Sequence, residues 1–184
     1  MNFCVEITNF KKLVDIIKNC VYHISIMSAM EVLETVAENN IPHKHPLTAM
    51  IWTNEEGSLV HGMSRPIGAL FHVPHGMSNA MLLEKCMTFA KDGALDRFSE
   101  LARAIGLADD KTDNKTASES FTKALGELCR ICNVPTISEY GIDADEFVSV
   151  IPKMAHDALA SGSPQNMRKN ITEEDIVKIY HSLV

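Results

Sequence analysis

The 184-residue sequence contains no long apolar run, no excess of basic residues and no regular cysteine framework. A membrane-spanning helix needs ~20 consecutive apolar residues. No stretch approaches that length, so we expect no membrane partner. The 17 Lys and Arg against 24 Asp and Glu give a net charge of −7. This balance argues against nucleic acid, because nucleic-acid-binding domains present a basic face.

The start of the chain does not combine a basic segment, an apolar core and a small-residue cleavage site, the three marks of a signal peptide. The five cysteines form no even, regular set, and this is typical of proteins kept in a reducing compartment. We therefore expect a cytoplasmic protein. With 46% apolar and 22% charged residues, a chain of this length can bury one core.

The sequence also has no glycine-rich loop of the kind that cradles phosphate. It contains no G-x-G-x-x-G motif, the usual signature of a dinucleotide-binding loop. It contains no Gly-Gly-Gly-Ser run either. An Asp-x-x-x-His pair is absent as well: Asp15 is followed four positions later by Asn19, and His23 lies eight residues on. Neither a nucleotide-binding unit nor a helical carboxylate–imidazole pair is therefore expected.

What the sequence does contain is the stretch 58–83, SLVHGMSRPIGALFHVPHGMSNAMLL. In a helix, His61, Arg65, Gly68 and His72 fall at i, i+4, i+7 and i+11, on one face. Pro74 lacks an N–H and biases the preceding residue toward an extended conformation. The first helix should therefore stop near His72, and a second helix should run from residue 77 to about residue 91.

This arrangement places His75 at a corner between two helices, where its ring could turn toward His61. Neutral imidazole is the commonest protein ligand for divalent transition metals, and mixed histidine and carboxylate sites suit iron or zinc. A single histidine here is better explained by helix packing. The pair, flanked by glycines in an apolar run, favours a metal site, although two ligands alone do not complete one.

Residues 58–83 resemble the signature of the iron-containing (group III) alcohol dehydrogenases, which reads His-Gly-Met, Gly-Ala, Pro-His-Gly, Asn-Ala and Leu-Leu in this order. The likeness extends from about residue 57 to the C-terminus and is strong again over residues 157–164 and 171–180. It implies an all-α fold, a multi-helix bundle like the C-terminal domain of that family. We expect about seven helices, with a short strand over residues 2–7 as a further option.

The resemblance also implies roles for four residues. Those matching His61 and His75 are two of four ligands to a catalytic divalent metal, most often iron, with zinc as the alternative. The other two ligands in the family are an aspartate and a histidine four residues apart on an earlier helix. Arg65 stands where many members have a histidine near the nicotinamide and the substrate, and His72 would line the same cleft. No residue of this chain is assigned to cofactor binding.

The implied activity is interconversion of a primary alcohol and an aldehyde with NAD(P) in a complete enzyme, with the metal as a Lewis acid. Residues 57–184 would form the family's helical domain. Residues 1–56 would be a diverged or truncated helical segment and connector. Because the nucleotide-binding half and two metal ligands are missing, we expect this chain to be inactive alone, either as a fragment or with an N-terminal part that has diverged or been replaced.

The expected partners are a small-molecule alcohol or aldehyde and either a second copy of the chain or the missing nucleotide-binding half. The alternative is a non-catalytic helical remnant or interaction module of the same ancestry. The helices that face the cleft in this family pack against a domain that is absent here. We therefore expect an uncovered apolar patch and self-association.

After the motif, the sequence predicts helices to its end. A helix over residues 94–105 is closed by Gly106. Thr116 with Glu119 would form a capping box opening a helix to about residue 132. The C-x-x-C of Cys129 and Cys132 lies inside that pattern. Redox and zinc roles are alternatives there, but buried helix cysteines are the better interpretation.

Two further helix starts are marked by acidic or hydroxyl side chains. Asp143, with Glu146 three residues on, caps one helix, and Thr172 with Asp175 starts the last one. Pro152 should break the first of these, leaving a short helix to residue 150 and a restart with proline in the first turn.

Overall fold

The computed structural model of the protein describes residues 59–184. Six α-helices and two 3₁₀ helices make up this part of the chain, which contains no strand. The elements in order are α4 (Leu59–Phe71), α5 (His75–Ala90), η1 (Lys91–Gly93), α6 (Leu95–Ala104), α7 (Asn114–Ile131), α8 (Ala144–Ala160), η2 (Ser163–Gln165) and α9 (Glu173–His181). The expected all-α fold is confirmed here. The expected strand over residues 2–7 lies outside the described residues.

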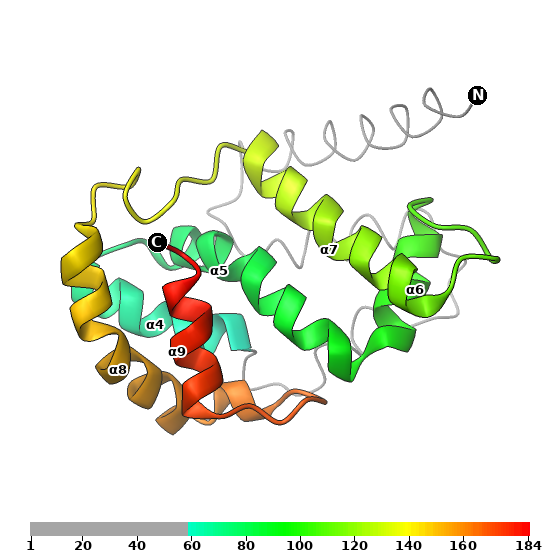
Figure 1. Cartoon of the computed structure of the whole chain (residues 1–184). Helices are drawn as coiled ribbons and strands as arrows, with labels where there is room; N and C mark the ends of the chain where they lie inside the picture. Colours follow the sequence, from blue (N-terminus) through cyan, green and yellow to red (C-terminus); the bar gives the residue numbers. More distant parts are fainter. Residues whose placement is uncertain (1–58) are drawn as a thin grey trace.

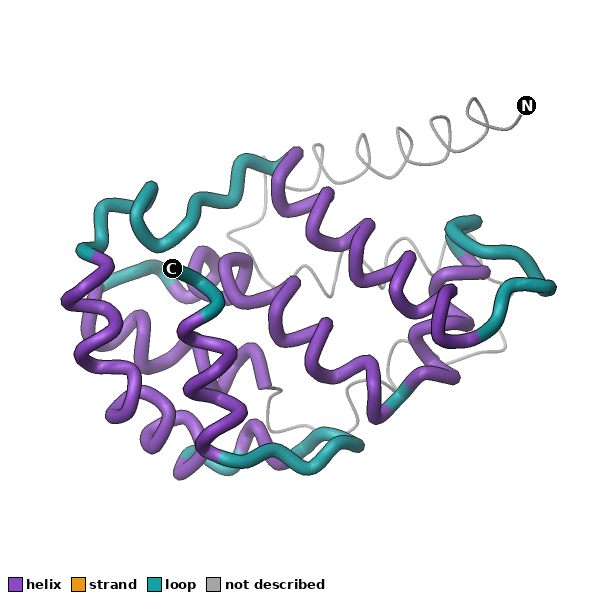
Figure 2. The backbone as a smooth tube through the Cα atoms, in the orientation of Figure 1, coloured by secondary structure: helices purple, strands orange, loops and turns teal. Residues whose placement is uncertain are grey.

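Helix α5 joins two groups of helices (Figures 1 and 2). At one end it packs on α4, which in turn contacts α8 and η2, while α9 packs on α8. Farther along, α5 contacts α7, and α7 pairs with α6. No helix among residues 59–184 is long and apolar enough to cross a membrane.

The corner between α4 and α5 follows the predicted pattern closely. Helix α4 ends at Phe71, and His72 then takes a left-handed conformation with φ 54°. Pro74 precedes α5 in an extended conformation as its N-cap residue. The second helix begins at His75, two residues before the expected start at residue 77.

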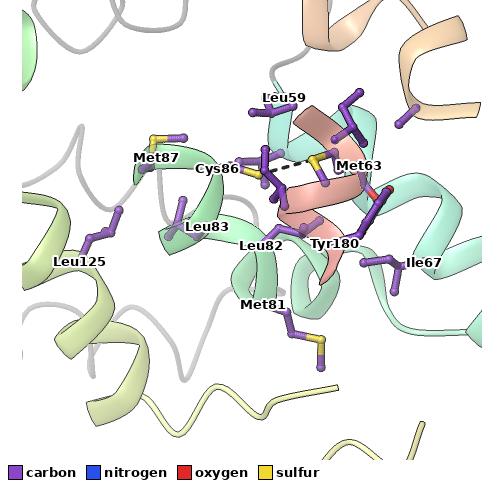
Figure 3. Packing of buried hydrophobic residues seen from close by; sticks show 14 of the residues in the cluster. Leu59, Met63, Ile67, Met81, Leu82, Leu83, Cys86, Met87, Leu125 and Tyr180 are labelled. Atoms are coloured by element: carbon purple, nitrogen blue, oxygen red, sulfur yellow. Dashed lines mark hydrogen bonds between the residues drawn. The ribbon is translucent and has the colours of Figure 1, made fainter. Parts of the chain in front are cut away.

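The core beside this corner connects α4, α5 and α9 (Figure 3). The Cys86 thiol of α5 points to the Met63 sulfur of α4, with Sγ and Sδ 3.8 Å apart. Tyr180 of α9 is completely buried, and its hydroxyl donates a hydrogen bond of 2.6 Å to the carbonyl oxygen of Met63. Burial raises the pKa values of Tyr180 and Cys86 well above their usual range, so both groups stay protonated.

The segment after α8 reaches α4 through a glycine. A Cβ atom built on Gly62 would lie 2.7 Å from both Cδ and Cγ of Pro164 in η2. Only a residue without a side chain therefore allows the proline ring to pack directly on the backbone of α4. This close approach fixes the first turns of α4 against the C-terminal part of the chain.

Most helix boundaries agree with the sequence predictions. The Asp143 side chain accepts a hydrogen bond from the Glu146 amide, as expected. Thr172 and Asp175 form a complete capping box. Gly106 has φ 77° after the end of α6, also as expected.

The capping box expected at Thr116 and Glu119 is wrong. Asp113 is the N-cap of α7, and its carboxylate accepts a hydrogen bond from the Thr116 amide. The helix therefore begins at Asn114, and Thr116 occupies the third helical position. Both aspartate and threonine are good N-cap residues, and the earlier one starts the helix here.

The break expected at Pro152 is also wrong, because α8 continues unbroken through it. A proline inside a helix removes the hydrogen bond to the residue four positions earlier, here Val148, at a cost of ~3 kcal/mol. Both residues are exposed, so water reaches that side of α8. The opposite side buries Ile151 and Met154 completely. Burial of each such side chain contributes about 1.5–3 kcal/mol, which offsets the proline.

Candidate metal centre

Two histidine rings lie close together at the α4–α5 corner. His61 is the third residue of α4, and His75 is the first residue of α5. Their ring centroids are 5.2 Å apart, and the ring planes are inclined by 51°. The structure therefore brings together the two imidazoles that the sequence predicted to converge.

This separation suits a shared cation. With metal–nitrogen distances of ~2.0–2.1 Å, each ring centroid lies ~3.2 Å from the metal. Two such rings at coordination angles of ~90–110° then have centroids ~4.5–5.2 Å apart. The measured 5.2 Å falls at the upper end of that interval. The donor chemistry fits as well, since imidazole nitrogen is a good ligand for iron and zinc.

The His75 ring is held by side chains from both helices. Ser64 Oγ of α4 lies 3.3 Å from His75 Nδ1 and 3.1 Å from the carbonyl oxygen of His61. Asn79 Nδ2, one turn along α5, lies 3.2 Å from His75 Nε2. The amide oxygen of Asn79 is buried, and no partner for it is found among the described residues.

The surroundings of His61 keep its ring neutral. Burial, and then the neighbouring charges of His75 and Arg65, lower the pKa of His61 below its usual value of 6.5. Metals bind the deprotonated imidazole, and protons compete for the same nitrogen. A lowered pKa therefore favours metal binding near neutral pH.

The other two site residues that the sequence predicted are Arg65 and His72. Arg65 follows His61 by one helical turn and is exposed. His72 lies just beyond the end of α4, so the helical spacing that related it to His61 ends before it, and it is exposed. Their expected places beside a substrate cleft therefore remain predictions.

The described residues supply only part of a metal site. Among residues 59–184 there is no group of three or more His, Cys, Asp or Glu side chains placed to hold one ion. His61 and His75 thus form a pair of donors. Any further protein ligand has to come from outside this part of the chain.

The C-x-x-C pair shows no sign of a second metal or redox centre. Cys129 lies in the last turn of α7, and Cys132 is the C-cap residue rather than part of the helix. Both are half-buried. Burial, with smaller contributions from Cys132 and Glu84, raises the pKa of Cys129 to about 11. The reactive thiolate is therefore scarce at neutral pH.

The sequence suggested no role for Ser64 or for Asn79. Asn79 follows His75 by four residues in the same helix, a spacing that places two side chains on one face. This spacing could therefore have predicted the contact of Asn79 with His75 from the sequence. The contact of Ser64 with His75 joins two helices, and only the folded corner shows it.

The fold and the paired rings define an all-helical domain with a candidate metal-binding corner. The model of the Fe-containing alcohol dehydrogenase family, C-terminal, matches residues 20–184. The chain belongs to this family, and the match is to its C-terminal domain.

Two curated relatives give the scale of the likeness. Lactaldehyde reductase of Escherichia coli (strain K12) is 28% identical over 137 residues, which are 74% of this chain and 35% of the relative. NADPH-dependent butanol dehydrogenase of Clostridium saccharobutylicum is 26% identical over 145 residues, 78% of this chain and 37% of the relative. The chain thus spans about a third of the length of these relatives.

Solved structures show the same fold. An alcohol dehydrogenase from Oenococcus oeni superposes with a TM-score of 0.66 at 24% identity, covering 88% of this chain and 46% of that one. A 1,3-propanediol oxidoreductase superposes with a TM-score of 0.63 at 23% identity, covering 69% and 32%. These similarities establish the helical architecture.

Proposed function

We propose that this chain provides the helical metal-binding half of an alcohol dehydrogenase of the iron-containing family, with His61 and His75 as two of the metal ligands. The observation that carries the proposal is the 5.2 Å separation of the two rings, together with the family membership. Iron is the expected metal, and zinc is the alternative. NAD(P) would be bound by a nucleotide-binding half outside residues 59–184.

In such an assembly a bound metal would act as a Lewis acid on an alcohol or aldehyde oxygen, and NAD(P) would carry the hydride. The residues of this chain would hold and orient the reacting groups. His61 and His75 offer imidazole nitrogens from two helices that the core fixes against each other. Ser64 and Asn79 fix the orientation of the second ring.

Arg65 adds a permanent positive charge one helical turn from His61. Arginine stays protonated at neutral pH and so transfers no proton. We expect it to attract a negatively charged oxygen of the substrate or a phosphate of the cofactor. His72 is proposed to line the same cleft, with a smaller effect because its side chain lies beyond the helix.

A non-catalytic helical module is the second candidate function. The observation in its favour is that residues 59–184 hold no group of three or more potential metal ligands. A site with two histidines alone should bind a cation weakly and release it readily to a chelator. Such a module would keep the fold and lose the chemistry.

Metal binding and turnover separate the two candidates. The full chain should bind Fe²⁺ or Zn²⁺ more tightly than its His61→Ala and His75→Ala variants, as measured by calorimetric titration. The His156→Ala variant is the matched control. His156 is an exposed residue of α8, and it pairs with Glu173 of α9 rather than with a residue of the α4–α5 corner. Equal affinities for all four proteins would rule out the proposed metal site.

Activity is then measured with NAD⁺ or NADP⁺, short primary alcohols and Fe²⁺. We expect none from the chain alone, and turnover when a family nucleotide-binding half that includes the earlier aspartate and histidine ligands is added. In the active mixture, Arg65→Ala should raise the KM for cofactor or substrate. An unchanged KM would contradict the role of Arg65. Metal binding without turnover in any combination would favour the non-catalytic module.

A further inference from the structure

Both nitrogens of the His75 ring have a partner, one from each helix. Ser64 is completely buried and Asn79 is 7% exposed, whereas His75 itself is exposed. We propose that Ser64 and Asn79 are positioning residues that hold His75 in the tautomer with hydrogen on Nδ1, leaving the Nε2 lone pair for a divalent cation. The role of Nε2 in binding a cation rests on the proposed function, whereas the tautomer itself does not.

With the Asn79 amide oriented as in the structure, the donors and acceptors around the ring fit one assignment. The NH₂ group of Asn79 can only donate, so Nε2, at 3.2 Å, must accept and carries no hydrogen. A neutral imidazole then has its hydrogen on Nδ1. That hydrogen is donated to Ser64 Oγ, which in turn donates its own hydrogen to the carbonyl oxygen of His61 at 3.1 Å. The two hydrogen bonds thus run from His75 of α5 through Ser64 to the His61 carbonyl oxygen, both of α4.

This orientation of the Asn79 amide has a cost. Asn79 Oδ1 finds no partner among the described residues, an arrangement that costs ~1–3 kcal/mol for a buried polar atom. The opposite orientation of the amide would place Oδ1 on Nε2 and require a hydrogen there. The evidence for hydrogen on Nδ1 is therefore the Ser64 hydroxyl, whose single hydrogen is donated to the His61 carbonyl, so that its oxygen accepts from the ring.

This arrangement would prepare His75 for a metal. Ligating histidines commonly have their second nitrogen fixed by a hydrogen bond, and loss of that bond lowers metal affinity by about 10–100-fold. Ser64 would serve as this partner of Nδ1. Asn79 would occupy Nε2 in the free protein and give way when a cation arrives.

The test reads the tautomer directly in the metal-free full chain. Long-range nitrogen–proton NMR correlations, recorded in a mildly alkaline buffer, distinguish Nδ1–H from Nε2–H. We expect Nδ1–H in the wild type, a mixture of tautomers in Ser64→Ala, and reversal to Nε2–H in Asn79→Asp, because a carboxylate can only accept. Ser78→Ala is the matched control, since its buried hydroxyl contacts only backbone oxygens of Pro74 and His75.

A wild-type ring with hydrogen on Nε2 overturns the proposal, as does a tautomer that stays the same in both Ser64→Ala and Asn79→Asp. A Zn²⁺ titration is the separate test of the metal role. Ser64→Ala should bind about 10–100-fold more weakly than the wild type, and Ser78→Ala should match the wild type. An Nδ1–H tautomer in a chain that binds no Zn²⁺ would confirm the positioning and rule out the proposed function, so the two failures are distinguishable.

Discussion

At the scale of single residues, the buried environment of His61 connects the candidate site to stability. Its pKa is lowered in the folded protein by burial, His75 and Arg65. The unfolded chain, with an ordinary pKa near 6.5, therefore binds a proton at a higher pH than the folded chain does. As the pH falls below 6.5, the unfolded state gains this proton first, and the folded state becomes less stable.

We expect the free energy of unfolding to decrease as the pH is lowered through this window, and to decrease less in His61→Gln. Urea titrations at a series of pH values measure the difference between the two proteins, so that other titrating groups cancel. Parallel pH profiles for the wild type and the variant would show that the environment of His61 does not affect folding.

The close approach at Gly62 gives a second prediction at this scale. In Gly62→Ala the new methyl group would meet the ring of Pro164 at 2.7 Å. Overpacking of this kind costs ~1–3 kcal/mol, and thermal unfolding would measure it. Gly126→Ala is the control, because its Cβ meets only the flexible side chain of Glu84. That control should be neutral or slightly more stable, since alanine favours a helix.

At the scale of helices, the hydrogen bond from Tyr180 ties α9 to α4. Tyr180→Phe removes the hydroxyl and leaves the Met63 carbonyl without this donor. We expect a loss of ~0.5–1.5 kcal/mol in the free energy of unfolding, measured by urea denaturation. Tyr140→Phe is the control, since Tyr140 is exposed and its change should stay within ~0.5 kcal/mol. Equal losses in both variants would contradict a specific role for the α9 hydroxyl.

Local signals predicted most of these helices. Proline and glycine mark the ends of α4 and α6, and Asp143 and Thr172 mark two starts. Such signals work because they depend on hydrogen bonds within one turn of the chain. The failure at Pro152 has a different origin, since burial on the far side of α8 outweighs the local penalty.

The candidate site was likewise predictable only where it depends on local sequence signals. The convergence of His61 and His75 could be predicted because one proline corner relates them. The contact of Ser64 with the second ring depends on how α4 and α5 pack, and helical spacing gives no information on it. The metal ligands beyond these two could not be predicted, because the sequence has no Asp-x-x-x-His pair.

At the scale of the whole molecule, one continuous core runs through all six helices of residues 59–184. A protein consisting of these residues alone should therefore unfold in a single cooperative transition. Circular dichroism, for helix content, and tyrosine fluorescence, for packing, would give coincident midpoints. Separate midpoints would mean that the α6–α7 pair unfolds independently of the rest.

The expected self-association remains a prediction at the same scale. Among the described residues, Leu70 and Val148 are large apolar side chains with exposed fractions of 38% and 37%. Light scattering of the full chain should report a species larger than a monomer, and a dye for apolar surface should bind. A monomer that binds no dye would contradict this expectation. Leu70→Ser with Val148→Ser would show whether these two side chains contribute.

The position of His75 in the first turn of α5 has an electrostatic consequence. The amino end of a helix carries a partial positive charge, and Arg65 adds a full one close to His61. A divalent ion between the two imidazoles would enter surroundings that repel it, and the ring partners Ser64 and Asn79 bring no negative charge. An anionic ligand would offset this repulsion, so small carboxylates such as acetate should strengthen Zn²⁺ binding by this chain.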